Sequence, residues 1–198
     1  MPDHQLQHIR RKLAHHQPPP PPSLETPAQA AVALLLQSRA EGLHLLFIHR
    51  AHHPRDPWSG HMAFPGGRKN PEDADLCITI HREVKEEVGI DLDSQGEYLG
   101  RLAELQAMSR GRLVSMTVTP FIYLISPEAE LQPSPAEVQD TIWVPMEFIL
   151  QDVAESLVRQ PITDGITIEV PALLYGGKTI WGMTYRMLRE FLKLIAEK

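Results

Sequence analysis

Hydrophobic and polar positions follow different periods along the chain. Apolar residues run almost without a break through residues 28–37 and again through residues 43–50, and residues 38–42 form a polar turn between them. Apolar runs of this length are typical of strands that are buried on both faces. We therefore expect a hairpin at the centre of a sheet, although the alanine-rich first run leaves a helix open.

The rest of the chain alternates between strand-like and helical patterns. β-Branched and aromatic residues predict strands over residues 98–105, 113–125 and 137–144. Helical patterns cover residues 145–158 and 184–198, and between them residues 166–174 and 178–181 fit a hairpin around Gly176-Gly177. Strands and helices in this irregular order predict a mixed sheet with helices packed on it, an α/β (α+β) fold.

One further helix is predicted over residues 71–88. Pro71 suits a first helical turn, Asn70 is a suitable N-cap, and Gly89 is suited to end the helix in a left-handed conformation. At 100° per residue, one narrow stripe is apolar, and we expect it to be the buried face. Its members are Cys77, Ile80, Val84 and Val88.

Three carboxylates, Glu83, Glu86 and Glu87, share one flank of this helix over an arc of about 100°. They repel one another unless a cation lies among them. Hard divalent cations take oxygen ligands, and carboxylates one turn apart can share such a cation. The alternative is an ordinary solvated acidic surface, although such surfaces usually intersperse charges of opposite sign.

The context of these glutamates resembles a known signature. The run Arg82-Glu-Val-Lys-Glu-Glu-Val-Gly-Ile90 matches the second half of the Nudix box, and Gly67 matches its opening glycine. The chain is similar in this respect to the Nudix hydrolases, which hydrolyse nucleoside diphosphates linked to another moiety. The spacing from Gly67 to Arg82 is one residue longer than in the family pattern. The upstream acidic position therefore falls on Asp73 or Glu72 with an insertion, or on Ala74 without one.

The resemblance implies a set of site residues within a mixed β-sheet sandwiched between α-helices. It implies that Glu83, Glu86 and Glu87 hold Mg²⁺ or Mn²⁺ and that Arg82 orients a glutamate. It implies that the general base is Glu86 or Glu83. Glu137 falls where Nudix proteins often carry another acid, and a solvated surface glutamate is the alternative there.

The segment before the box resembles the coenzyme A pyrophosphatase branch of the family. Its signature aligns with Arg50, Arg55, Gly60 and the run Phe64-Pro-Gly-Gly67, although Arg55 and Gly60 lie one residue further apart than in that branch. Arginines can hold phosphate oxygens bidentately, and structural ion pairs are the alternative for both of them. Gly66 and Gly67 would let the helix approach a bound diphosphate closely.

Three functional hypotheses follow from this resemblance. The first is hydrolysis of coenzyme A or acyl-coenzyme A to 3′,5′-ADP and (acyl-)phosphopantetheine. The second is hydrolysis of ADP-ribose, a sugar nucleotide or a nucleoside triphosphate, which the shifted loop keeps open. The third is a non-catalytic nucleotide-binding module, and the intact glutamates speak against it.

The composition of the chain indicates which kinds of molecule it can bind. With 19 Lys and Arg against 25 Asp and Glu, the net charge is −6, whereas nucleic acid and anionic membranes attract an excess of basic residues. We expect a small nucleotide-derived substrate and neither nucleic acid nor membrane. The single cysteine, Cys77, cannot form an intramolecular disulfide, which favours a reducing, cytoplasmic location.

The chain divides into an extension and one domain. Five consecutive prolines at residues 18–22 form a stiff segment with no backbone donors, and a spacer is a simpler role for it than a ligand for a proline-recognising module. We therefore expect residues 1–25 to be an N-terminal extension and residues 26–198 to be the Nudix domain. Nudix relatives are often dimers, so a homodimer is compatible with the resemblance.

Overall fold

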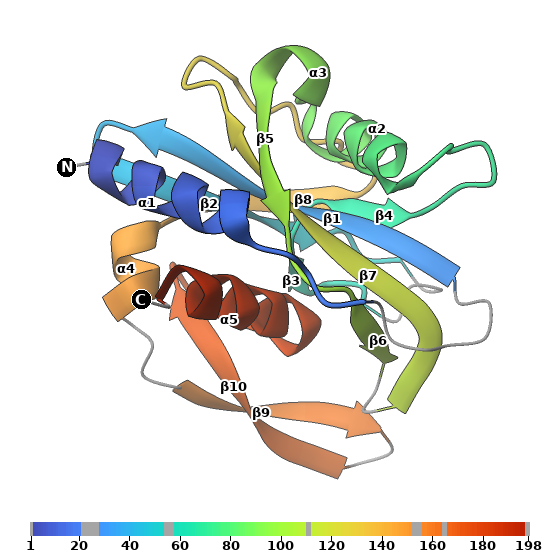
Figure 1. Cartoon of the computed structure of the whole chain (residues 1–198). Helices are drawn as coiled ribbons and strands as arrows, with labels where there is room; N and C mark the ends of the chain where they lie inside the picture. The colour runs from blue at the N-terminus through green and yellow to red at the C-terminus, as the bar shows by residue number, and fades with distance from the viewer. Residues whose placement is uncertain are drawn as a thin grey trace.

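A large mixed sheet lies between two layers of helices (Figure 1). The computed structural model describes residues 2–20, 28–53, 58–109, 112–151, 156–163 and 166–196. Its helices are α1 (Pro2–His15), α2 (Leu76–Val88), α3 (Leu92–Gln95), α4 (Met146–Gln151) and α5 (Gly182–Ala196). The mixed α+β architecture predicted from the sequence is confirmed.

The strands form two sheets. The larger has the order β3-β2-β1-β7-β5, with β4 paired to β1, β6 to β7 and β8 to β2, and the smaller has the order β11-β10-β9. The strands of the larger sheet are β1 (Ala28–Arg39), β2 (Gly42–Arg50), β3 (Met62–Ala63), β4 (Gly66–Arg68), β5 (Gly96–Arg101), β6 (Leu105–Ser109), β7 (Arg112–Ile125) and β8 (Val138–Pro145). Those of the smaller are β9 (Ser156–Thr163), β10 (Ile166–Tyr175) and β11 (Lys178–Trp181).

The hairpin expected at the centre of the sheet is β1 and β2, which pair antiparallel with Leu36 opposite Leu45. On its other side β1 runs parallel to β7. Successive β1 residues alternate between two cores: Leu35 packs in the core that contains α2, and Leu34 in the core that contains α1 and α5. Burial on both faces explains why the apolar run is continuous.

Helices α1 and α5 cover the sheet face opposite α2 (Figure 1). Ile9 and Leu13 of α1 are buried in the same core as Phe191 of α5. The residues before the polyproline segment therefore contribute to the main core. The division of the chain into an extension and a domain stays a prediction.

Helix α2 begins later than predicted. The expected start at Pro71 is wrong, because residues 70–73 form a tight turn in which the Asn70 N–H donates to Asp73 and the Asp73 N–H donates to the Asn70 carbonyl. Asp75 is the N-cap, and its carboxylate accepts a hydrogen bond of 2.9 Å from the Ile78 N–H. The predicted end is confirmed, because Gly89 is left-handed with φ of 74°.

The buried face of α2 also differs from the predicted stripe. Cys77 is exposed, whereas Thr79 and Glu87 are buried beside the expected Ile80, Val84 and Val88. Cys77 lies in the first turn of α2. A buried carboxylate on this helix is a first sign that the face has a role besides packing.

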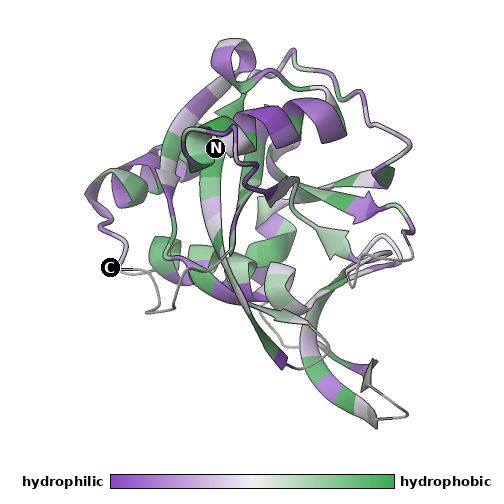
Figure 2. Cartoon of the chain, turned by 90° about the vertical axis from the view of Figure 1, so that its right-hand side faces the viewer, coloured by the Kyte–Doolittle hydropathy of each residue, from purple (hydrophilic) through white to green (hydrophobic). Residues whose placement is uncertain are grey.

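The C-terminal third contains one further correction. The predicted helix over residues 145–158 is too long, because α4 ends at Gln151 and β9 begins at Ser156. The predicted hairpin around Gly176-Gly177 is confirmed as β10 and β11. The β9–β10 hairpin extends away from the large sheet in both views (Figures 1 and 2). No helix in the described ranges is long and apolar enough to cross a lipid bilayer.

Candidate functional site

Two consecutive glycines bring β4 against helix α2. The Gly66 N–H donates a hydrogen bond of 2.7 Å to the Glu87 carboxylate, and φ at Gly66 is +144°. A Cβ atom on Gly67 would lie 2.5 Å from the carboxylate of Glu83. A side chain at Gly66 would meet the Ala31 carbonyl of β1, and one at Gly67 would displace the Glu83 carboxylate, so the paired glycines allow β4 to lie close to both β1 and α2.

Three carboxylates converge beside this contact. Oxygen atoms of Glu83, Glu87 and Glu137 lie within 4.8 Å of one another. Glu83 and Glu87 are one turn apart on α2, and Glu137 comes from the turn before β8, where its carbonyl accepts a hydrogen bond of 2.8 Å from the Ala51 N–H. The arrangement offers oxygen ligands from two elements to one hard divalent cation.

The electrostatics of this cluster favour a cation. Burial raises the pKa of Glu87 to about 8, against the hydrogen bond from Gly66 and the charge of Arg50, which lower it. Burial likewise raises the pKa of Glu83. Glu87 is only 3% exposed. A buried carboxylate facing two others is costly when ionised, and a divalent cation among them offsets that cost, so these residues fit a metal ion.

Arg82 links the cluster to the loop before α2. Its guanidinium donates to Glu83 at 2.8 Å, to Glu86 at 3.0 Å and, through two nitrogens, to Asp73. The hydrogen bonds from Arg82 lower the pKa of Asp73 to about 2. The contact between Arg82 and Glu83 is compatible with the orienting role predicted for Arg82, which stays a prediction.

Two of the three predicted metal ligands belong to the carboxylate cluster. Glu83 and Glu87 converge with Glu137, whereas Glu86 is half exposed and pairs with Arg82. The role of Glu86 as ligand and base stays a prediction. Asp73 is the residue that the sequence left undecided: it contacts Arg82, while the alternatives Glu72 and Ala74 are exposed. Helical periodicity cannot find Asp73, because the residue lies before the helix begins.

Of the two arginines predicted to contact the substrate, Arg50 is among the described residues. Arg50 ends β2, and its guanidinium lies 3.7 Å from the Glu87 carboxylate, so it makes an ion pair at the edge of the carboxylate cluster. Both of the roles weighed for Arg50, structural pairing and ligand contact, are compatible with this position. Arg55 lies outside the described residues.

The carboxylate cluster opens into a cleft of about 1110 Å³. Charged and glycine residues form one part of its lining, among them Arg50, Gly67 and Glu83. Apolar side chains from β6, β7, β10 and α5 form much of the rest. They include Met108, Met116, Val118, Ile168, Val170, Met183 and Met187. A cleft of this kind suits a ligand with one strongly anionic part and one uncharged part.

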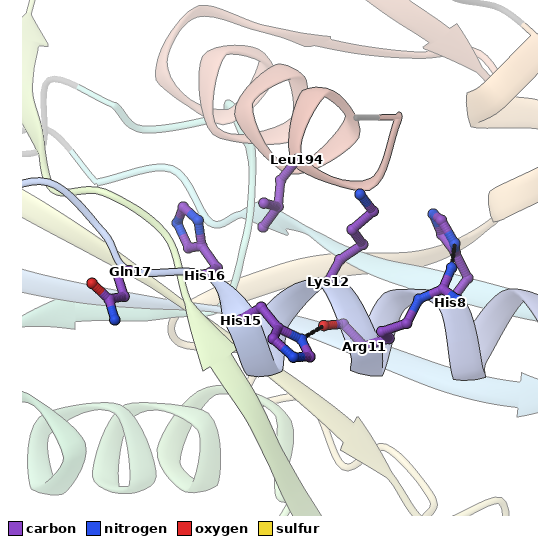
Figure 3. A pocket seen from close by; sticks show the side chains of 7 residues that line it. All are labelled: His8, Arg11, Lys12, His15, His16, Gln17 and Leu194. Atoms are coloured by element: carbon purple, nitrogen blue, oxygen red, sulfur yellow. Dashed lines mark hydrogen bonds between the residues drawn. The ribbon is translucent and has the colours of Figure 1, made fainter. Parts of the chain in front are cut away.

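A second hollow, of about 600 Å³, lies between α1 and α5 (Figure 3). Its lining is basic or neutral: His8, Arg11, Lys12, His15, His16, Gln17 and Leu194. Basic residues near the last turn of α1 complement the negative end of the helix dipole. No carboxylate is among the described residues that line this hollow, so those residues do not form a carboxylate site for a hard cation.

The chain belongs to the Nudix family. The family model described as the NUDIX domain matches residues 26–163, which include the hairpin, the glycine pair, helix α2 and Glu137. The chain is therefore a member of the Nudix hydrolases, whose substrates are nucleoside diphosphate derivatives. Divalent-metal dependence is general in this family, in agreement with the convergent carboxylates.

Individual relatives extend the match along the chain. The Nudix hydrolase NudL of Yersinia pestis is 32% identical over 175 residues, which cover 86% of this chain and 81% of NudL. A protein of Schizosaccharomyces pombe is 34% identical over 118 residues, 59% of this chain, and the match spans 36% of that protein. A MutT/Nudix family protein from Enterococcus faecalis has the same fold, with a TM-score of 0.52, 19% identity and coverage of 98% of this chain and 74% of that one.

Proposed function

We propose that the protein hydrolyses the diphosphate of coenzyme A or acyl-coenzyme A and releases 3′,5′-ADP and (acyl-)phosphopantetheine. The observation that carries the proposal is the combination of a carboxylate cluster and an extended apolar lining in one cleft. Coenzyme A has the matching composition, since its diphosphate is strongly anionic and its pantetheine arm is uncharged. Three residues of the run Phe64-Pro-Gly-Gly67, which resembles the coenzyme A branch, line the same cleft: Phe64, Gly66 and Gly67.

In the proposed reaction, Glu83 and Glu87 hold Mg²⁺ or Mn²⁺, with Glu137 as a further oxygen ligand. A divalent cation at such a site neutralises the diphosphate and lowers the pKa of a bound water. Arg82 fixes the carboxylate of Glu83, and Asp73 fixes Arg82. The glycine pair allows the diphosphate to approach α2 without a side chain in between.

The bond changes follow from hydrolysis of an anhydride. The oxygen of a water molecule attacks one phosphorus, the bridging P–O bond breaks, and the leaving phosphate retains the bridging oxygen. A carboxylate takes the proton of the attacking water. Glu83 and Glu86 remain the predicted bases, with Glu137 as the alternative, and Glu137 is an exposed carboxylate on the lining of the cleft.

Product identification tests the proposal. The protein is incubated with Mg²⁺ or Mn²⁺ and separately with coenzyme A, acetyl-coenzyme A, ADP-ribose, a sugar nucleotide and a nucleoside triphosphate, and the products are separated by chromatography. We expect 3′,5′-ADP from the two coenzyme A samples, no product with EDTA, and a loss of about 100-fold or more in Glu87→Gln. Turnover confined to the other substrates contradicts the substrate assignment. If no sample gives a metal-dependent product, the result favours the non-catalytic nucleotide-binding module.

The proposal includes a reducing, cytoplasmic location and a homodimer. A reducing compartment fits the single cysteine, Cys77, whose thiol is exposed and free. Sedimentation analysis of the purified protein measures the oligomeric state. A monomer at micromolar concentration would contradict the dimer and leave the reaction unaffected.

A further inference from the structure

Arg186 occupies an unusual position on the cleft. It is exposed, lies in the second turn of α5 and lines the same cleft as the carboxylate cluster. One nitrogen of its guanidinium lies 3.4 Å from the sulfur of Met108 and 3.6 Å from that of Met183. Both sulfurs belong to the apolar lining, so the guanidinium is held against the wall of the cleft.

Thioether sulfur is a weak acceptor. Across the described ranges, no carboxylate forms a salt bridge with Arg186, so most donors of its guanidinium are available to a ligand. A guanidinium can exchange weak sulfur contacts for two parallel hydrogen bonds to a phosphate oxygen pair at little cost. The methionines restrain the side chain beforehand, which reduces the conformational entropy that binding has to remove.

Among the described residues, the other arginines that line the cleft, Arg50 and Arg68, are associated with the metal-binding end. Arg50 pairs with Glu87, and the carbonyl of Arg68 accepts a hydrogen bond of 3.2 Å from Arg82. Both arginines therefore lie at the end of the cleft where the diphosphate binds in the proposed function. Arg186 comes from a different element, α5, and its guanidinium contacts the methionines of the apolar lining.

We propose that Arg186 binds a second phosphate of the substrate, a phosphate monoester separate from the diphosphate that is cleaved. This inference rests on the proposed function, in which that group is the 3′-phosphate of coenzyme A. Arg186 thereby distinguishes substrates that carry a monoester on the nucleoside from those that lack it. Arg186 thus contributes to substrate specificity, whereas the carboxylate cluster carries out the bond cleavage.

A pair of substrates that differ only in this group tests the inference. The ratio of kcat/KM for coenzyme A to that for dephospho-coenzyme A is measured in the wild type, Arg186→Gln, Arg186→Lys and Lys193→Gln. Lys193 is the matched control, since it is an exposed cation on the same helix, about 10 Å further along the axis, and is not among the residues that line the cleft. A charge-assisted contact of this kind corresponds to a ratio of about 10 to 100.

We expect the ratio to fall toward one in Arg186→Gln, to be partly retained in Arg186→Lys and to equal the wild-type ratio in Lys193→Gln. An equal ratio in the wild type and Arg186→Gln overturns the inference, as does a wild type without preference. A second measurement is independent of turnover. Calorimetric titration with adenosine 3′,5′-bisphosphate and with AMP should show tighter binding of the bisphosphate in the wild type and loss of that difference in Arg186→Gln.

The two measurements separate the two proposals. If the wild type does not cleave coenzyme A, the proposed function fails, and the titration alone decides the role of Arg186. If the wild type cleaves coenzyme A and Arg186→Gln binds both nucleotides as the wild type does, the proposed function stands and the inference about Arg186 fails.

Discussion

Asp73 lies before helix α2 and fixes the position of Arg82 on that helix through hydrogen bonds. Its carboxylate accepts hydrogen bonds from Arg82, from the hydroxyl of Thr79 and from the Asn70 N–H. These bonds stabilise the ionised carboxylate, which in turn fixes the guanidinium that holds Glu83. The site therefore depends on a residue that contributes no ligand to the carboxylate cluster.

Asp73→Asn should reduce stability in a pH-dependent way. The pKa of Asp73 is lowered from 3.8 to about 2 in the folded protein, so its ionised form stabilises the fold above about pH 4 and loses that contribution as the pH falls toward 2. Urea unfolding measures the free energy of unfolding of the wild type and Asp73→Asn between pH 2.5 and 7, for example at steps of about half a unit. We expect the difference in this free energy between the two proteins to become smaller at low pH. Glu72→Gln is the control, because Glu72 is exposed. If the difference in free energy of unfolding became larger on acidification, this would contradict the stabilising role of ionised Asp73.

Alanine at the two glycines should have different effects. At Gly67 the new methyl group meets the end of the Glu83 side chain, which can move, so Gly67→Ala should fold normally and lose about 100-fold in kcat/KM. At Gly66 the methyl group meets the Ala31 carbonyl at 2.2 Å and φ is +144°, so Gly66→Ala should lower the free energy of unfolding by more than about 1 kcal/mol. Thermal unfolding and steady-state kinetics measure both. Equal thermal stability of the two variants would be evidence against the close packing of β4 on β1.

The sequence predicted the residue types of the site better than their grouping. Glu83 and Glu87 share a helix flank, so periodicity alone brings them together. Glu137 joins them only through the pairing of β8 with β2, a contact between distant segments that no local pattern shows. Glu86 lies on the same arc and pairs with the same Arg82 nitrogen as Glu83, but it is half exposed, and its carboxylate is not one of the three that converge.

At the scale of an element, α2 shows where local signals mislead. Asn70 and Pro71 have the residue types of a helix start, but the backbone groups of Asn70 are used in the turn with Asp73. Asp75 offers an equally good cap five residues later, and the tertiary contact between Asp73 and Arg82 favours the later start. By contrast, the β1–β2 hairpin was predictable, because long apolar runs joined by a short polar turn have few alternatives.

Alanine substitutions at Asn70 and Asp75 distinguish the two possible start positions of helix α2. Asp75→Ala should reduce the free energy of unfolding by about 0.5–2 kcal/mol, because it leaves the Ile78 N–H without its side-chain acceptor. Asn70→Ala should have a smaller effect, because the two hydrogen bonds between Asn70 and Asp73 use the backbone of Asn70. Chemical denaturation measures both values. A larger loss at Asn70 than at Asp75 would restore the earlier helix start.

At the scale of the whole molecule, α1 packs into the main core. Ile9 is fully buried between α5 and the sheet, and Ile9→Ala should lower the free energy of unfolding by about 2–5 kcal/mol. His4→Ala is the control on the same helix, since His4 is exposed. Denaturation curves of both variants provide the measurement, and a loss below about 0.5 kcal/mol at Ile9 would show that α1 packs loosely.

The parallel pairing of β1 with β7 also affects how the protein is made. Ala28 lies opposite Met116 and Gln37 opposite Ile125, so each contact joins positions 88 residues apart. At a synthesis rate of about 5–20 residues per second, the apolar β1 run leaves the ribosome about 4 to 18 s before its parallel neighbour exists. During that interval β1 can pair with β2, while its other edge has no partner from β7. The strand at the centre of the finished sheet therefore waits for several seconds with one edge unpaired, and during that time aggregation and chaperone binding compete with folding.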